Sequence, residues 1–160
     1  MPFYKTGAVQ KLPLAKEDYN IVFNTLVQIA PDIVFAAGDL SDPHGTHRMC
    51  LDAVISALSR YKREKGKSPD VLLYRGAWQE WEPHEVDMAV PVSPAELYHK
   101  RHAIFRHESQ KDRAMFPGPY DSREFWQRAE DRNRATANVY DRLGLPKYHG
   151  VEAFKRYIIE

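Results

Sequence analysis

Hydrophobic residues follow two patterns along the chain, helical stripes and short uninterrupted runs. Stripes at helical spacing predict a helix over 16–30 and a second over about 47–63, which Gly66 ends. The runs IVFAA at 33–37 and VLLY at 71–74 have no polar break. Such runs are typical of strands that are buried on both faces.

After residue 85 the sequence predicts a further strand followed by a further helix. Residues 86–92 alternate weakly between apolar and polar positions and predict a third strand. Ser93, Pro94 and Glu96 have the spacing of a helix start, with Ser93 as N-cap and Glu96 completing a capping box. We expect this helix to reach roughly Glu108.

Prolines and glycines divide the last third of the chain. They exclude regular structure over 111–121, and Asp121 with Glu124 predicts the start of a helix over about 122–143. The many charged residues of this helix indicate a solvated face with i,i+4 ion pairs. We predict a short final helix near 150–158.

The order of these elements predicts the fold class. Strands that alternate with helices indicate an α/β protein with a mainly parallel sheet between two helical layers. We therefore expect residues 1–160 to form a single domain, a Rossmann-like three-layer sandwich.

Composition and charge argue against some classes of binding partner and indicate a cellular compartment. The net charge is +1 and no long run of one sign occurs, which argues against a nucleic-acid or membrane surface. The single cysteine, Cys50, excludes an internal disulfide and fits a reducing compartment. Without a signal peptide or an apolar stretch of membrane length, the chain is expected in the cytoplasm.

The segment 38–48 joins the first predicted strand to the second predicted helix, which is where open α/β sheets place ligand sites. It contains His44 and His47, together with Asp39 and Asp42. Imidazole is the commonest metal ligand in proteins and exchanges protons near neutral pH. This segment is therefore the first candidate site.

A hydrolytic zinc needs about three protein ligands and one open position for water. His44 and His47 supply at most two ligands, and Asp39 and Asp42 could orient the imidazoles. The alternative is that both histidines are solvated or cap the helix.

Two motifs carry a resemblance to a known family. DPHGTHR at 42–48 resembles the second motif of the LmbE/PIG-L family, zinc-dependent N-deacetylases of N-acetylglucosamine derivatives. KRHAIFRHESQ at 100–110 resembles the Lys-x-x-Ala-x-x-x-His-x-Ser-Gln helix end of the same family, and the two motifs stand in the family's order.

Further segments are similar to one subgroup. AAGDL at 36–40, YRGAWQEW at 74–81 and DSREFW at 121–126 resemble the C-terminal region of long bacterial proteins. In those proteins a glucosamine-6-phosphate deaminase (isomerase) is fused to an LmbE-like domain. The resemblance implies that the chain is the C-terminal portion of an LmbE-like fold. Its partners would be the upstream half of that domain and the deaminase domain.

The resemblance also implies roles for individual residues. His47 would be a zinc ligand, and His44 would be the catalytic histidine that stabilises the tetrahedral oxyanion. The family's first motif, His-Pro-Asp-Asp, is absent, and Thr46 stands where the family often has Asp. Because residues 1–7 also read like the end of a strand, we expect a fragment that binds zinc weakly and catalyses little alone.

Candidate substrate contacts follow the second predicted strand. Arg75 and Trp78, with Trp81 nearby, are placed to line an amino-sugar pocket in which indole rings stack on a pyranose. Packing and a surface ion pair explain these residues equally well. His84, His99, His102 and His149 have no partner pattern and are expected at the surface.

Two other functions stay open. The chain is alternatively a non-catalytic sugar-binding or assembly module that has kept the fold. A third hypothesis is a phosphosugar pocket that uses the helix start near His47 as an anion site. An incomplete sheet would leave an open edge, which favours a homodimer.

Overall fold

The chain forms two compact units in the computed structural model, which describes residues 12–38, 45–77, 79–108 and 121–160. The first unit comprises Met1–Tyr74 and Lys155–Glu160, and the second comprises Arg75–Phe154. No helix in the described ranges is long and apolar enough to cross a membrane.

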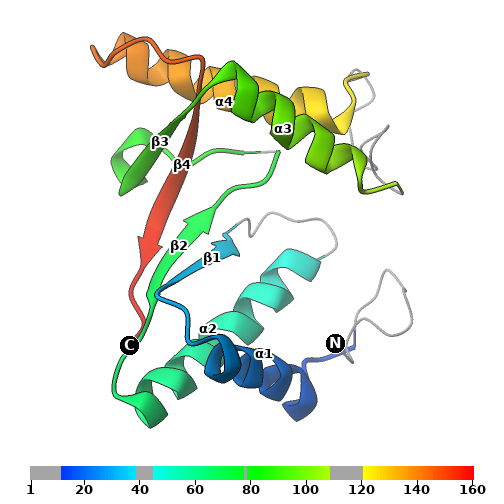
Figure 1. Ribbon diagram of the computed structural model, residues 1–160, viewed down its shortest axis with the longest axis vertical. Helices are drawn as coiled ribbons and strands as arrows, with labels where there is room; N and C mark the ends of the chain where they lie inside the picture. The colour runs from blue at the N-terminus through cyan, green and yellow to red at the C-terminus, as the bar shows by residue number, and fades with distance from the viewer. Residues whose placement is uncertain (1–11, 39–44, 78, 109–120) are drawn as a thin grey trace. The chain divides into compact units, whose positions relative to one another are not determined.

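The first unit contains two helices and two parallel strands (Figure 1). Their bounds confirm the predicted order: α1 (Lys16–Ile29), β1 (Ile33–Ala37), α2 (Thr46–Lys65) and β2 (Asp70–Tyr74). The strands β1 and β2 run parallel, with Ile33 opposite Asp70 and Ala37 opposite Tyr74. Their carboxyl ends therefore lie at the same edge, where the backbone N–H of Gly38 donates to the carbonyl of Tyr74 at 2.7 Å.

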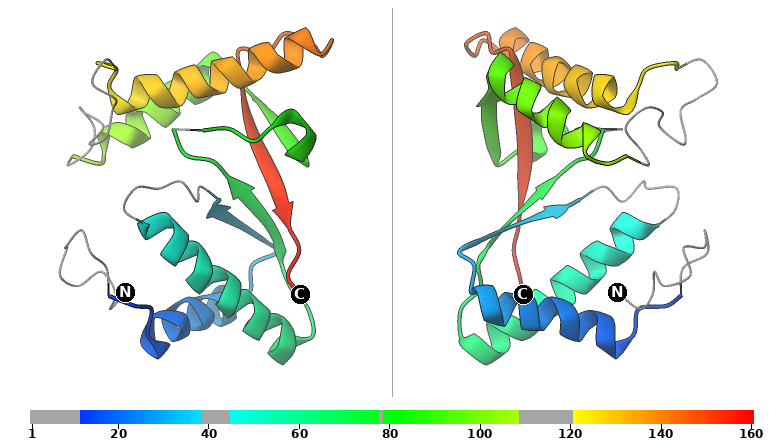
Figure 2. Two further views of the ribbon diagram at one scale, coloured as in Figure 1. Left: turned by 180° about the vertical axis from the view of Figure 1, so that it is seen from behind. Right: turned by 45° about the vertical axis from the view of Figure 1, so that its right-hand side comes forward.

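Local signals define both helices of the first unit. The fully buried Asp18 accepts a hydrogen bond from the backbone N–H of Ala15 at 3.0 Å and thereby caps α1. Gly66 ends α2 as predicted, in a left-handed conformation with φ of 70° that a side chain would strain. The two helices pack against each other, as the views of Figure 2 also show.

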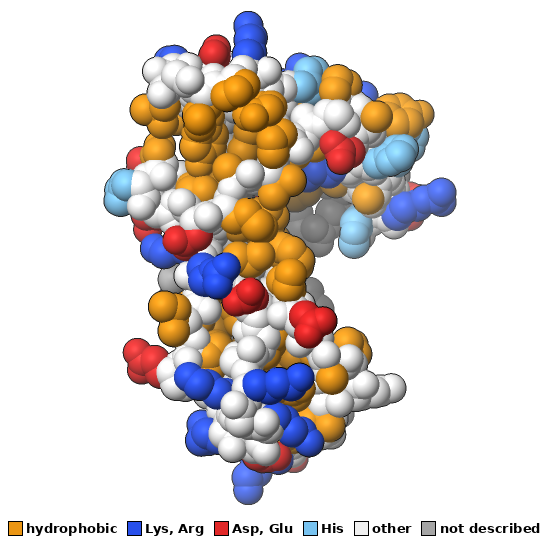
Figure 3. Space-filling view, turned by 60° about the vertical axis from the view of Figure 1, so that its left-hand side comes forward, with side chains coloured by type: hydrophobic (Ala, Val, Ile, Leu, Met, Phe, Trp, Pro, Cys, Tyr) orange, Lys and Arg blue, Asp and Glu red, His pale blue; other side chains and the backbone are white. Residues whose placement is uncertain are grey.

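Strand β1 differs from its prediction as a fully buried strand. Ile33 and Phe35 are 49% and 54% exposed, whereas Ala36 is buried. Exposed and covered residues alternate along β1, so one face of this strand is covered and the other is open. Hydrophobic side chains at the surface are visible in Figure 3.

The second unit contains the 3₁₀ helix η2 (Pro83–Glu85), β3 (Met88–Val92), α3 (Pro94–Phe105), α4 (Phe125–Arg142) and most of β4 (Gly150–Tyr157). The predicted capping box is confirmed: Ser93 Oγ accepts from Glu96 N at 3.3 Å, and Ser93 N donates to Glu96 Oε2 at 2.7 Å. Helix α4 begins later than predicted, because its N-cap is Glu124 rather than Asp121.

The predicted short helix at 150–158 is wrong, because this segment is the strand β4. It pairs antiparallel with β3, from Met88 opposite Phe154 to Val92 opposite Gly150. Buried Val151 and Ala153 alternate with Glu152, and this period of two fits a strand. The fold is thus α/β as predicted, but its four-stranded sheet is mixed rather than mainly parallel.

Candidate functional site

The structure covers only two of the predicted site residues. Asp39, Asp42, His44 and Trp78 lie outside the described residues. His47 is exposed in the first turn of α2, in the first unit. Arg75 belongs to the second unit.

His47 belongs to the first turn of α2, the element that follows β1 in the chain. Gly45, with φ of 66°, is the N-cap of α2 and turns the chain into the helix after the carboxyl end of β1. However, no three His, Cys, Asp or Glu side chains within the described ranges form a group that could hold a metal ion. His47 alone is one of the roughly three ligands that a catalytic zinc requires, so the described residues do not make up a zinc site.

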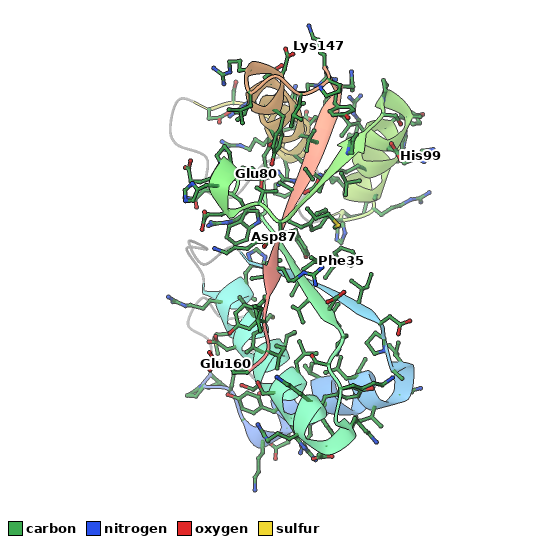
Figure 4. All side chains as sticks on the ribbon, turned by 90° about the vertical axis from the view of Figure 1, so that its left-hand side faces the viewer. Phe35, Glu80, Asp87, His99, Lys147 and Glu160 are labelled. Carbon is green, nitrogen blue, oxygen red and sulfur yellow. The ribbon has the colours of Figure 1, made fainter. Side chains whose placement is uncertain are left out.

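The second unit contains a cavity of about 510 Å³. One wall is formed by Ala77 and residues 79–83, and the other is a face of α4. Figure 4 shows Glu80 beside α4, close to η2. All the described residues that line the cavity belong to this unit.

Helix α4 faces the cavity with a row of polar side chains spaced four residues apart. This spacing places them one above the other on a single side of the helix. The row consists of Arg128, Arg132, Thr136 and Tyr140.

The carboxylate of Glu80 is held in one orientation by three donors. Glu80 Oε2 accepts from Arg132 Nη1 at 2.9 Å and from Thr136 Oγ1 at 3.1 Å, and Oε1 accepts from the backbone N–H of Trp81 at 3.0 Å. Burial raises the pKa of Glu80 above its ordinary value, and the opposing effect of Arg132 does not cancel it. Burial and the charge on Glu80 also raise the pKa of Tyr140.

Arg132 connects Glu80 to a second carboxylate, Glu152 on β4. Lys100 Nζ lies 2.8 Å from Glu152 Oε2 and donates to Asn133 Oδ1 at 2.8 Å. Burial alone would raise the pKa of Glu152, but the charges of Arg132 and Lys100 outweigh it and the pKa is lowered. Lys100, the first residue of the predicted motif at 100–110, thus belongs to this network.

Arg75 supports the cavity wall. Its Nη1 donates to Gln79 Oε1 at 2.8 Å, and its guanidinium lies over the ring of Trp81, 4.1 Å from the centroid. Gln79 and Trp81 both line the cavity. The direct sugar contact predicted for Arg75 stays a prediction, and its observed contacts hold the indole of Trp81 in place.

Comparison with known proteins gives one relationship. No family model matches the chain. The chain is 52% identical over 161 residues to a protein of Bacteroides thetaiotaomicron that is named "Putative glucosamine-6-phosphate deaminase-like protein". The match covers 99% of this chain and 24% of that protein, so the chain spans about a quarter of its relative's length. This chain is therefore related to one part of a deaminase-like protein.

Sequence reasoning missed the role of α4. It predicted a solvated face, but Arg128, Glu130, Asn133 and Thr136 are buried. The available signal was a set of charged and amide residues interleaved with small ones, Ala129 and Ala137, which leave room for close packing. The four surface histidines are confirmed as exposed, and Figure 4 shows His99 on the outer side of α3.

Proposed function

We propose that this chain is part of an amino-sugar enzyme in which a glucosamine-6-phosphate deaminase (isomerase) is joined to an LmbE/PIG-L-like N-deacetylase domain. The observation that carries this is the 52% identity, over almost the whole chain, to a protein named deaminase-like. The complete domain hydrolyses an N-acetyl group of an amino sugar in this proposal. The deacetylase part rests on the two motifs at 42–48 and 100–110.

Residue roles follow from the family resemblance. His47 contributes one zinc ligand, His44 stabilises the oxyanion, and Asp39 and Asp42 orient the imidazoles. The exposure of His47 in the first turn of α2, after the carboxyl end of β1, supports its part in this assignment. The remaining ligands come from residues outside the described ranges, including an upstream segment of the parent protein.

Zinc binding tests the metal part of the proposal. We expect the chain to bind zinc weakly, His47→Ala to abolish this binding, and His99→Ala to leave it intact. His99 is a matched control because it is an exposed helical histidine outside the loop site. The measurement is zinc titration of the three purified proteins by calorimetry; equal affinity in wild type and His47→Ala would overturn the assignment of His47.

Deacetylation is tested on the complete parent protein. Loaded with zinc, it should release acetate from N-acetylglucosamine or its 6-phosphate, and the His44→Ala variant should lose most of this rate. If a metal-loaded parent protein releases no acetate from either sugar, the deacetylase proposal is wrong and only the relationship to the deaminase-like protein stands.

A further inference from the structure

The cavity along α4 has the size of a small-molecule site. Its volume of about 510 Å³ lies within the range of roughly 300–1,000 Å³ that is usual for ligand pockets. A single sugar ring with its substituents fits this volume. His47 belongs to the other unit and is not among the described residues that line this cavity.

The charges that line the cavity balance. Among the described lining residues, Arg123, Arg128 and Arg132 contribute three positive charges and Glu80, Glu82 and Asp131 three negative charges, so their sum is zero. Most of these groups are already paired, for example Arg123 with Asp131 at 2.8 Å. Such a lining offers no excess charge to a polyanion. It offers fixed donors and acceptors, which suit a ligand with many hydroxyl groups.

Two polar groups at the cavity lack partners within the described part of the chain. Arg132 is 9% exposed, and its buried Nε has no hydrogen-bond acceptor among the described residues. The hydroxyl of Tyr140, which lines the cavity next to the charge of Glu80, likewise makes no hydrogen bond there. Buried polar groups are normally satisfied, so the buried Nε of Arg132 indicates a place for water or a ligand atom, and the Tyr140 hydroxyl is free to bond to the same ligand.

The cavity also has an apolar side. Trp81, which is 8% exposed, lines it together with Pro83, Ala135 and Val139. The guanidinium of Arg75 over the indole restricts the motion of this ring. Amphipathic aromatic rings next to fixed polar groups match the chemistry of a pyranose, which presents C–H groups on its faces and hydroxyls at its rim.

We propose that this cavity binds one hexosamine ring, with the hydroxyl of Tyr140 and the carboxylate of Glu80 bonding to sugar hydroxyls and Trp81 packing against the ring. The choice of an amino sugar rests on the proposed function; the choice of a small polyhydroxylated ligand rests on the cavity itself. The described residues of this proposed site all belong to the second unit.

Ligand titration followed by amide NMR of the whole chain tests this proposal. The probes are glucosamine, N-acetylglucosamine and glucosamine 6-phosphate, without added metal. At least one should shift amide signals of residues 79–83 and of the α4 row. Tyr140→Phe should weaken binding about three- to tenfold, the effect of one lost hydrogen bond, whereas Tyr98→Phe on the exposed side of α3 should not.

A bulky substitution inside the cavity distinguishes binding at this site from binding elsewhere on the protein. Ala135 is exposed and lines the cavity, so Ala135→Phe should fill the cavity with little effect on folding and abolish binding. Asn138→Phe is the matched control, because it adds the same ring to an exposed position of α4 outside the cavity. Undiminished binding in Ala135→Phe, or no binding of any probe by wild type, would overturn the proposal.

The outcome is independent of the zinc test. Sugar binding that survives His47→Ala while zinc is not bound would retain this site and reject the metal assignment. Zinc binding without any sugar-induced shift in residues 79–83 would do the reverse.

Discussion

Helices α2 and α4 are similar in length, 20 and 18 residues, yet they bury opposite kinds of side chain. The buried residues of α2 are all of the hydrophobic type: Leu51, Ala53, Ala57, Leu58 and Tyr61. Those of α4 are mostly polar: Arg128, Glu130, Asn133 and Thr136, with Ala129 and Ala137. A helix that only supports a fold has no need of the second composition.

This difference in buried residues indicates that α2 stabilises the fold, whereas the polar face of α4 orients particular side chains. Burial of leucine and tyrosine against α1 and β1 stabilises the first unit through the hydrophobic effect. Buried ion pairs contribute little net stability, because desolvation offsets their attraction. The network of Lys100, Glu152, Arg132 and Glu80 is therefore better explained by the fixed orientation that it gives to the cavity wall.

The largest effect is expected in the apolar region. Leu58 is 0% exposed in α2, so Leu58→Ala should lower the free energy of unfolding by about 4 kcal/mol through lost burial and a cavity. Urea denaturation measures this. Ile158→Ala, at a position that is 79% exposed, is the control and should change stability by less than about 0.5 kcal/mol. Equal losses in both variants would contradict the assignment of the core.

Breaking the polar network should cost slightly less. Arg132→Met leaves two half-buried carboxylates, Glu80 and Glu152, without their shared partner, and we expect a loss of about 3 kcal/mol. Arg156→Met removes the exposed pair with Asp70, in which both side chains are more than half exposed, and should cost less than about 1 kcal/mol.

A triple variant decides what the network is for. If its charges serve orientation rather than stability, Glu80→Met, Arg132→Met and Glu152→Met together should regain most of the stability lost in Arg132→Met alone. The comparison fails if the triple variant is less stable than the single one, since the network would then be a major source of stability.

What could be predicted from the sequence depended on how local its signal was. Helices α1, α2 and α3 were predictable because the signals of each lie within or directly beside that helix. These signals are the hydrophobic stripes of α1 and α2, Gly66 at the end of α2 and Ser93 at the start of α3. Strand β4 was not, because an eight-residue stretch is ambiguous and its identity depends on pairing with β3, about 60 residues earlier. The cavity was missed for the same reason: Arg132 is hydrogen-bonded to Glu80, which lies 52 positions away in the sequence.

A smaller effect tests one bond of the cavity wall. Thr136→Val removes the hydroxyl that lies 3.1 Å from Glu80 Oε2 and should lower the free energy of unfolding by about 1 kcal/mol. Thr25→Val in α1 is the matched control. The hydroxyls of Thr25 and Thr136 both bond to the backbone carbonyl four residues earlier, but only that of Thr136 also bonds to a carboxylate among the described residues. The control should change stability by no more than about 0.5 kcal/mol.

The finest distinction is between the two carboxylates that share Arg132, because their pKa values move in opposite directions from 4.5. Burial makes folded Glu80 hold its proton more tightly than unfolded Glu80, so its contribution to stability is complete below pH 4.5 and is lost as pH rises through the folded pKa. For Glu152 the lowered pKa gives a contribution that is present above pH 4.5 and is lost as pH falls through the folded pKa.

Two variants make this visible in urea denaturation across a pH series. The stability of wild type relative to Glu80→Gln should fall as pH rises above 4.5, and its stability relative to Glu152→Gln should fall as pH decreases below 4.5. Slopes of the same sign would mean that Arg132 and Lys100 act equally on both acids. Opposite slopes would mark Glu80 as the acid whose pKa is governed by burial, and Glu152 as the acid whose pKa is governed by its two cations, Arg132 and Lys100.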